Sequence, residues 1–520
     1  MDQELEIKLA LSPRDARKLA KKKGFKSGGA KRHRNRRLIS TYFDTPRHLL
    51  RKSNIALRIR DDGDRKTQTI KTPFAGPIGM QSMRELSTRV RGSEPELDRI
   101  SHPELMWRLS PDGGAHRLDS VFTTDVERTT LQLRARGADV ELAVDQGVIR
   151  TGHNGHKREE PICEAELELL SGDPVSLLDV ALEVCESYDV RLLHMSKADR
   201  GYALARRSLR PSPKKPARVE LSRSASAGQA FEIIMAGALE HLFANQVPVL
   251  QQHPGGVHQT RVALRRLRAG LRAFKMLLPY HERKAFNNEF RWFQKRLAPA
   301  RDWHVFLTET LPQIADHYPA STARLERIRR LARDERRRTT ADAIECLQSR
   351  RYTRLILQFQ RWLATLRDDI PAEVFDQPLL PFARAVLAKT RRDLLREERS
   401  LTHLPAEDLH GLRKLGKKVR YATEFFSYLW KRDSTKLYLR LMESLQDSLG
   451  EANDASVARH ILWTVSPGKL DAEAVRLVQD WSQDRVTDCI RAARQPWSEY
   501  RAIEPFWEND RMRNPRPLAE

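Results

Sequence analysis

Apolar and charged residues alternate strictly along residues 3–11. This period of two predicts a β-strand with one apolar face and one charged face. The charged face carries Glu4, Glu6 and Lys8. Two carboxylates and an ammonium group in one row can hold a divalent metal beside an anionic ligand. A solvated edge strand is the alternative explanation for the same pattern.

A second strand of this kind is predicted far downstream, at residues 163–169. Its charged face carries Glu164, Glu166 and Glu168, and its other face carries small and apolar residues. Two strands with carboxylate rows in one domain favour the walls of a site over two solvated edges.

Alternation also marks several shorter segments between these two strands. The segments are residues 38–43, 55–60, 67–71, 126–133 and 140–144. Turn residues at 61–64 and 136–139 join two pairs of them as hairpins. Helices are predicted from Ser12 to near Gly24 and over 174–186, and the basic segment 21–37 is predicted to be a solvated loop. Roughly eight strands with charges of both signs on one parity predict a sheet closed around a wet, charged interior.

The motifs of this region, taken in order, resemble those of a known family. They are Glu4-x-Glu6-x-Lys8, residues 42–45, residues 57–60, Lys71, Glu164-x-Glu166-x-Glu168 and residues 196–198. Over about the first 205 residues the chain resembles the CYTH family, the triphosphate tunnel metalloenzymes. The resemblance implies an α+β domain, an eight-stranded antiparallel tunnel with flanking helices. It also implies binding of a triphosphate, which is hydrolysed or cyclised with Mg²⁺ or Mn²⁺.

The resemblance implies a role for each matching residue. Metal ligands would be Glu4 and Glu6 with two of the three residues Glu164, Glu166 and Glu168, and which two stays open. Phosphate contacts would come from Lys8, Arg58, Arg60, Lys71, Arg84, Arg128 and Lys197. Catalysis would rest on Glu4, Glu6, Lys8, Arg58, Arg60 and Lys71. Glu85 follows Arg84 directly and is expected to point to the opposite face of its strand.

The composition and the hydrophobic pattern of the sequence change after residue 205. Residues 206–221 are basic and rich in proline, which predicts a linker between a domain at 1–205 and a second domain at 222–505, with a tail at 506–520. The second domain has long helical patterns and an internal repeat. His258 and His410 lie 152 residues apart, and so do Asp302 and Asp454. Two anchors at one offset indicate a duplication.

Each repeat predicts a helix with a basic stripe. In the first repeat the stripe consists of His258, Arg261, Arg265 and Arg268, and in the second of His410, Arg413, Lys417 and Arg420. An apolar stripe follows on another face of the first helix, and Glu424 interrupts the basic stripe in the second repeat. These features resemble the CHAD domain, which implies two all-α bundles related by a pseudo-twofold axis and a basic groove that binds inorganic polyphosphate.

Composition agrees with polyanionic ligands. The chain has 93 Lys and Arg residues against 69 Asp and Glu residues, a formal net charge of +24. Its four cysteines are scattered, so neither a disulfide framework nor a zinc site is predicted. No signal-peptide pattern and no uninterrupted apolar run of about 18 residues stands out. The expectation is a cytoplasmic protein that does not bind membranes, with an association with polyphosphate granules.

The sequence thus predicts a metal-dependent hydrolase of inorganic tripolyphosphate joined to a helical domain that binds long-chain polyphosphate. One alternative is another CYTH chemistry, either thiamine-triphosphate hydrolysis or adenylate cyclisation. A further alternative is a non-enzymatic module that binds polyphosphate or nucleic acid. Nucleic acid is disfavoured because no aromatic residues interleave the basic stripe.

Overall fold

The structure is a computed structural model, and it describes residues 2–22, 24–26, 28–74, 76–77, 80–99, 117–153, 156–205, 212–396, 406–465 and 472–508. The chain forms two compact units. The first comprises Met1–Arg210 and Gln348–Thr365, and the second comprises Pro211–Leu347 and Leu366–Glu520.

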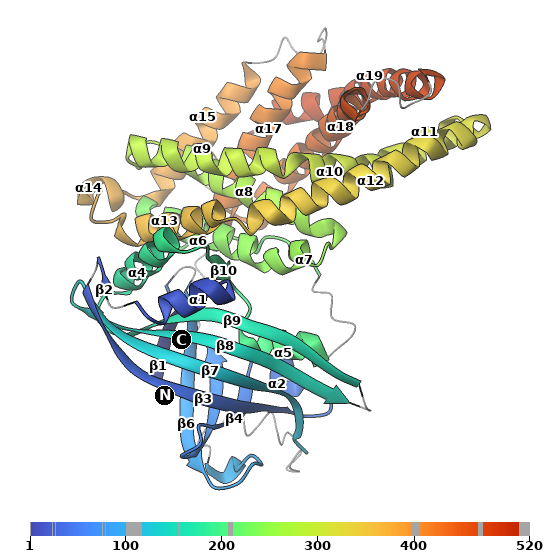
Figure 1. The fold of residues 1–520 in the computed structure, drawn as a ribbon. Helices are drawn as coiled ribbons and strands as arrows, with labels where there is room; N and C mark the ends of the chain where they lie inside the picture. The colour runs from blue at the N-terminus through green and yellow to red at the C-terminus, as the bar shows by residue number, and fades with distance from the viewer. Residues whose placement is uncertain are drawn as a thin grey trace. The chain divides into compact units, whose positions relative to one another are not determined.

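The first unit is built on a closed β-sheet (Figure 1). Eight antiparallel strands follow one another in the order β1-β6-β5-β4-β3-β7-β8-β9, and β9 pairs with β1 to close the ring. Their bounds are β1 (Asp2–Ala10), β3 (Gly28–Asp44), β4 (Ala56–Asp61), β5 (Lys66–Pro73), β6 (Gln81–Val90), β7 (Asp119–Ala135), β8 (Ala138–His153) and β9 (His156–Ser171). The predicted eight-stranded antiparallel tunnel is confirmed. Two short strands, β2 (Gly24–Phe25) and β10 (Arg191–Leu193), pair with β3 and β1.

Several strands are longer than their patterns suggested. β3 already begins at Gly28, so much of the basic segment predicted to be a loop is strand. It pairs with β7 from Ala30 onward. A tight turn between β7 and β8 places Arg136 and Gly137 at positive φ, as a two-residue hairpin loop requires.

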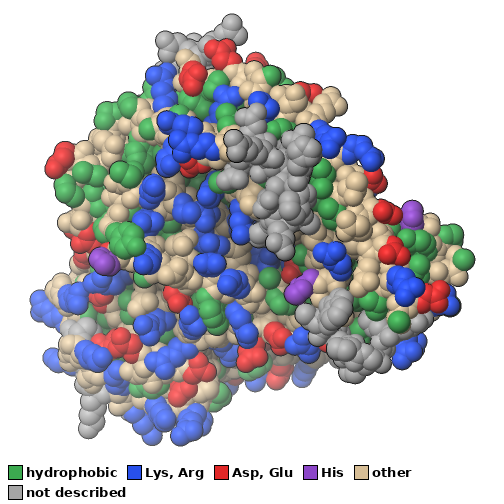
Figure 2. Space-filling model, turned by 90° about the horizontal axis from the view of Figure 1, so that it is seen from above, with side chains coloured by type: hydrophobic (Ala, Val, Ile, Leu, Met, Phe, Trp, Pro, Cys, Tyr) green, Lys and Arg blue, Asp and Glu red, His purple; other side chains and the backbone are tan. Residues whose placement is uncertain are grey.

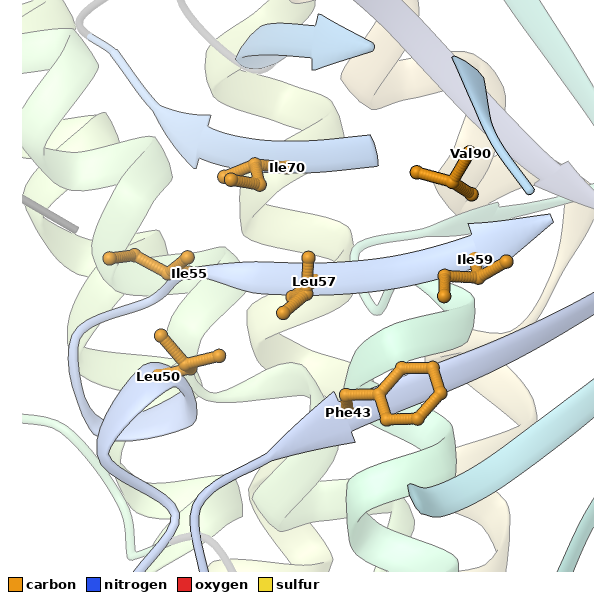
Figure 3. Packing of buried hydrophobic residues seen from close by; sticks show 7 residues of the cluster. All are labelled: Phe43, Leu50, Ile55, Leu57, Ile59, Ile70 and Val90. Atoms are coloured by element: carbon orange, nitrogen blue, oxygen red, sulfur yellow. The ribbon is translucent and has the colours of Figure 1, made fainter. Parts of the chain in front are cut away.

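The apolar residues of β4 and β5 point outward into a core of their own, while a second core of Tyr42, Phe122, Val126, Ile149 and Ile162 lies on the inward parity against Tyr202 of α5 (Lys197–Ala205). Figure 3 shows part of the first core, where Leu57, Ile59 and Ile70 of β4 and β5 pack with Phe43 of β3 and Leu50. Leu50 comes from α2 (Leu49–Lys52), which covers this face. Where the core lies outside the ring, as at β4 and β5, the inward parity is left free for charged side chains such as Arg58 and Arg60.

Three further helices pack on the strands of the tunnel unit, α1 (Pro13–Leu19) and α4 (Pro174–Ser187) outside the ring and α5 on the inward face of β7, where it meets Phe122. The side chain of Ser12 caps α1 by accepting from the backbone N–H of Asp15, as predicted, but the helix ends at Leu19, before Gly24. The predicted helix at 174–186 is confirmed as α4.

One helix of the tunnel unit comes from far along the chain. α13 (Arg350–Thr365) packs against α4 and carries several anchoring contacts. Arg361 Nε lies 2.5 Å from a carboxylate oxygen of Asp179, and Thr353 Oγ1 accepts from the Leu192 N–H at 3.2 Å. The compact units therefore differ from the predicted boundaries in this segment, which the sequence placed within 222–505.

The second unit is all-α (Figure 1). Its longer helices are α6 (Ala227–Ala244), α8 (Pro254–Ala273), α9 (Tyr280–Arg296), α12 (Thr322–Leu347), α15 (Leu379–Leu395), α17 (Ala406–Phe426), α18 (Arg432–Val465) and α19 (Ala472–Ala502). Shorter ones are α7 (Gln246–Leu250), α10 (Ala298–Val305), α11 (Leu311–His317) and α14 (Ala372–Phe375). A π-helical turn, Phe306–Thr310, joins α10 to α11. His258 and His410 lie on α8 and α17, so the sequence repeat corresponds to a repeated helix.

Among the described residues, one segment has the length and mean hydropathy of a membrane span, Ala227–Leu250. Its window is 56% buried within the structure. It contains Glu232 and Glu240, and α6 packs against α8. A core position in the helical unit accounts for its apolar composition.

Candidate functional site

Strands β1 and β9 set the register of the tunnel wall. Glu6 lies across from Glu168, and Lys8 lies across from Glu166. Glu4, Glu6 and Lys8 are each less than a tenth exposed, and they share one parity of β1. Antiparallel pairing therefore brings the two carboxylate rows of the sequence side by side within one wall.

One group of these carboxylates is tightly paired with cations. Asp145, Glu164 and Glu166 each have an oxygen within 4.8 Å of the others, which is a spacing that a metal ion could use. Lys197 Nζ lies 2.7, 2.5 and 2.9 Å from these three residues in turn. Arg128 donates two hydrogen bonds, of 2.7 and 2.6 Å, to the carboxylate of Asp145. The negative charge here is already balanced by protein cations.

In a second group, Glu4 contacts Lys71 and Glu6 lies 2.9 Å from Lys8 Nζ, whereas Glu168 forms no ion pair among the described residues. Burial, and then the carboxylate of Glu4, raise the pKa of Glu168 to about 7, with Glu141 and Glu6 acting in the same direction and Lys71 against it. A carboxyl group whose pKa rises among other carboxylates gains most from an added cation. The group Glu4, Glu6 and Glu168 is therefore the better candidate for a hard divalent metal with oxygen ligands, although the other group is the more compact.

Two buried arginines of β4 differ in the charges that surround them. Arg58 and Arg60 lie on the inward parity of β4, and among the described residues neither forms an ion pair with a carboxylate. Arg60 Nε contacts the hydroxyl of Ser40 at 3.4 Å. Burial, and then the charges of Arg58 and Arg128, lower the pKa of Arg60 to about 10. Burial also lowers the pKa of Arg58, but Tyr42, Glu85 and Glu4 outweigh it and raise that pKa. Arg60 is therefore the guanidinium with the greater need of an anion.

The wall at β5 and β6 corrects one prediction. Glu85 faces the tunnel, where it lies 2.9 Å from Lys71 Nζ, and Lys71 also contacts Glu4. Burial opposes the charge on Glu85, but Lys71 and Arg58 outweigh it and lower its pKa to about 2. Arg84 is exposed on the outer face beside Phe74 and does not line the tunnel. The prediction for Arg84 was wrong because the inward parity of β6 follows from its pairing of Lys71 with Glu85.

Helix α5 supplies the inward-reaching Lys197 at its first residue. Gly201 of the same helix lies against the ring of Phe122, where a Cβ would come within 2.2 Å of a ring carbon. Tyr202 packs edge-on against Phe122 and donates to Asp44 at 2.9 Å. These contacts fix α5 so that Lys197 reaches the carboxylates of β8 and β9.

The structure adds residues that the sequence did not single out. Asp145 of β8 pairs across the sheet with Glu164. Tyr42 of β3 lies opposite Arg58, and although burial raises the pKa of Tyr42, Arg58 and Arg60 outweigh it and lower that pKa. Asp145 follows a predicted strand directly, which was the available signal. Tyr42 carried none beyond its place in the motif.

The basic stripe of α8 is partly buried in the second unit. Arg261 Nη1 donates to the carbonyl of Gln294 at 3.0 Å, and Arg268 Nε to the side chain of Asn287 at 3.3 Å. The Nε atom of Arg265 is buried without a hydrogen-bond partner. Burial lowers the pKa of Arg261 to about 10, assisted by Arg265 and opposed by Asp302.

The basic residues of α17 interact electrostatically with those of α8. Burial, and then Arg413 and Arg265, lower the pKa of Lys417 to about 6. Arg413 is influenced by both Asp454 and Asp302. Arg420, by contrast, is paired with Glu424 at 2.9 Å. The side chain of His410 lies outside the described residues. Figure 2 shows Lys and Arg side chains gathered in the middle of the face that it presents.

Comparison with known families agrees with both halves of the chain. The family model described as CYTH domain matches residues 2–202, and the one described as CHAD domain matches residues 233–463. The chain combines a CYTH domain with a CHAD domain. The tunnel of the first unit corresponds to the CYTH match, and the helical repeats of the second unit to the CHAD match.

Two similar proteins are informative. An inorganic triphosphatase of Haemophilus influenzae is 32% identical over 204 residues, which are 39% of this chain and 55% of that protein. The chain thus matches little more than half the length of that relative. The crystal structure of the CHAD domain from the plant Ricinus communis is 28% identical, with a TM-score of 0.51. It covers 56% of this chain and 98% of that domain.

Proposed function

We propose that the CYTH domain hydrolyses inorganic tripolyphosphate with Mg²⁺ or Mn²⁺, and that the CHAD domain binds long-chain polyphosphate. The observation that carries the first part is the separation of charge inside the tunnel. Among the described residues neither Glu168 nor Arg60 forms an ion pair, and the pKa of Glu168 is raised while that of Arg60 is lowered. A metal-bound triphosphate supplies both missing charges at once.

The residues of the tunnel fit a hard divalent metal. Glu4, Glu6 and Glu168 would hold it, because carboxylate oxygens are the ligands such ions prefer. The metal would offset charge on the phosphate oxygens and lower the pKa of a bound water. The register of β1 with β9 favours Glu168 as the principal ligand from the second row, since Glu166 is engaged by Lys8 at 3.3 Å.

The protein's own cations would bind and orient the substrate. Arg58 and Arg60 suit bidentate contacts with phosphate oxygens, and Lys71 suits a point-charge contact. Lys8, Arg128 and Lys197 are engaged by carboxylates, so their first role would be to hold those carboxylates in place, and Lys71 would contact phosphate while it also holds Glu4 and Glu85. Preplaced cations stabilise the charge that develops on the leaving phosphate without reorganising during the reaction.

The relative from Haemophilus influenzae supports inorganic triphosphate as the substrate class, since it is named an inorganic triphosphatase. Thiamine triphosphate and ATP are the competing substrates. A panel of these three compounds, each assayed with Mg²⁺ and with Mn²⁺, tests the assignment. We expect the largest kcat/KM for tripolyphosphate, and a larger value for either organic triphosphate would overturn it.

Polyphosphate binding by the helical unit is supported by the surplus of cations on α8 and α17. Their pKa values are lowered by burial and mutual repulsion, so a polyanion relieves both costs. Equilibrium binding of a labelled long-chain polyphosphate to the full chain tests this part. Competition with duplex DNA at equal phosphate concentration provides the contrast, and DNA that displaces polyphosphate equally well would leave only a generic basic surface.

A further inference from the structure

Equivalent arginines in the two halves of the helical unit have partners of different charge. In the first half, Arg268 bonds only to neutral groups, the side-chain oxygens of Asn287 and Gln294. Burial, and then the charges of Arg272 and Arg291, lower the pKa of Arg268 to about 10. This guanidinium therefore carries a positive charge that no carboxylate within the described part of the chain offsets by an ion pair.

At the equivalent position of the second half, 152 residues later, Arg420 is neutralised. Its Nε lies 2.9 Å from Glu424, and its Nη2 lies 3.7 Å from Glu443. Burial lowers the pKa of Arg420, but Glu424 outweighs it and raises that pKa. Glu424 occupies the position that Arg272 holds in the first half. At this position the second half therefore has an acid in place of a cation, and that acid pairs with Arg420.

A second helix shows the same bias. α10 carries Arg301 and His304 one turn apart, and both act on the charge of His258 on α8. The equivalent residues of α18 are Asn453 and Ser456, which are uncharged. Arg301 pairs with Glu309 at 3.3 Å, and the side chain of Glu309 is half exposed to solvent. The first half is thus richer in cations on both helices that line the basic face.

We propose that the first half is the primary polyphosphate site and that the second half is a weaker extension of it. The primary site consists of His258, Arg261, Arg265, Arg268, Arg301 and His304. This inference rests on the proposed polyphosphate binding and adds Arg301 and His304 to the residues that the ligand contacts. A phosphate chain gains less at Arg420 because it meets the carboxylate of Glu424 there, whereas at Arg268 it meets only neutral partners.

Matched substitutions at equivalent positions test the asymmetry on the full chain. Arg268→Gln and Arg420→Gln each remove one guanidinium from the basic face. Binding of fluorescently labelled long-chain polyphosphate is measured at fixed ionic strength. We expect Arg268→Gln to weaken binding by roughly tenfold and Arg420→Gln by less than about twofold, on the scale of single phosphate contacts. Equal losses would overturn the inference while leaving polyphosphate binding intact.

A second variant guards against loss of folding at the half-buried Arg268. Arg301→Asn gives the first half the residue that the second half already has, and Ser456→Ala serves as its control on α18. We expect weaker binding for Arg301→Asn with an unchanged melting temperature, and no change for Ser456→Ala. Binding unaffected by Arg301→Asn would contradict the primary site. Absence of polyphosphate binding by the unaltered chain would instead remove the proposed function and this inference together.

Discussion

Glu6 of β1 and Glu168 of β9 lie directly opposite each other across the seam that closes the tunnel. Two residues further along β1, Lys8 meets Glu166 in the same way. Glu6 therefore faces another carboxylate across the seam, whereas Lys8, on the same face of β1, faces a carboxylate of opposite charge. Lys8 Nζ lies 2.9 Å from Glu6 and 3.3 Å from Glu166, so Glu168 is the member of these two pairs that forms no ion pair among the described residues.

Substitution of the two β9 carboxylates should separate metal binding from ion pairing. Glu168→Gln is expected to raise the metal concentration needed for half-maximal activity by about tenfold or more, because it removes one of the three proposed metal ligands, Glu4, Glu6 and Glu168. Glu166→Gln is expected to act mainly on stability, since it removes a carboxylate that Lys8, Lys197 and Arg128 share. A loss on the order of 3 kcal/mol in the free energy of unfolding is typical of breaking a buried pair. Metal titrations of activity and thermal melting of both variants provide the comparison; reversed effects would exchange the two assignments.

Arg60 and Arg84 provide a matched test of which arginines face the substrate. Arg60→Ala removes an uncompensated guanidinium from the tunnel and should lower kcat/KM for tripolyphosphate by about a hundredfold or more. Arg84 lies on the outer face, so Arg84→Ala should change kcat/KM by less than about twofold. Steady-state kinetics under saturating metal measure both values. A large effect of Arg84→Ala would mean that β6 has the opposite parity.

Polyphosphate binding should depend on pH through Lys417. Its pKa of about 6 leaves the amine neutral at higher pH in the free protein. A bound polyanion favours the charged ammonium and raises that pKa, so the complex takes up a proton. Affinity should therefore fall as pH rises from about 6 to about 9. Lys417→Arg, whose side chain stays charged, should flatten this dependence. An identical pH profile for the variant and the unaltered chain would remove Lys417 from the account.

The helix α13 should contribute to the stability of the tunnel unit. Thr353→Val keeps the shape of the side chain but removes the acceptor for the Leu192 N–H. It should lower the free energy of unfolding by about 1–3 kcal/mol, the cost of leaving a buried donor unpaired. Thr365→Val is the control, because that hydroxyl bonds only to carbonyls of its own helix. Denaturant unfolding of both variants measures the difference, and equal effects would argue against α13 as part of this unit.

The sequence predicts the tunnel well because alternation of charged and apolar residues is a local signal. It places Glu4, Glu6 and Lys8 on one face, and the structure keeps them there. It fails where the answer depends on a partner strand. Glu85 and Arg84 are neighbours in the chain, and only the pairing of Glu85 with Lys71 decides which of them faces inward.

Long-range packing accounts for the other differences. Nothing in the local pattern of residues 350–365 indicates that Arg361 meets Asp179, about 180 residues earlier in the chain. The basic start of β3 resembles a loop because its polar residues do not alternate with apolar ones, yet pairing with β7 makes it a strand. The choice among Glu164, Glu166 and Glu168 likewise needed the cations that surround each of them.

Hydrolysis of inorganic tripolyphosphate by the full chain tests the central claim most directly. Phosphate release is measured with Mg²⁺, with Mn²⁺ and with excess chelator, for the unaltered chain and for Glu6→Gln. We expect activity with metal that falls by about a hundredfold or more in chelator and in the variant. Restoring the metal should rescue the unaltered chain and leave Glu6→Gln impaired. Undiminished hydrolysis in chelator, or no hydrolysis with either metal, would contradict the account.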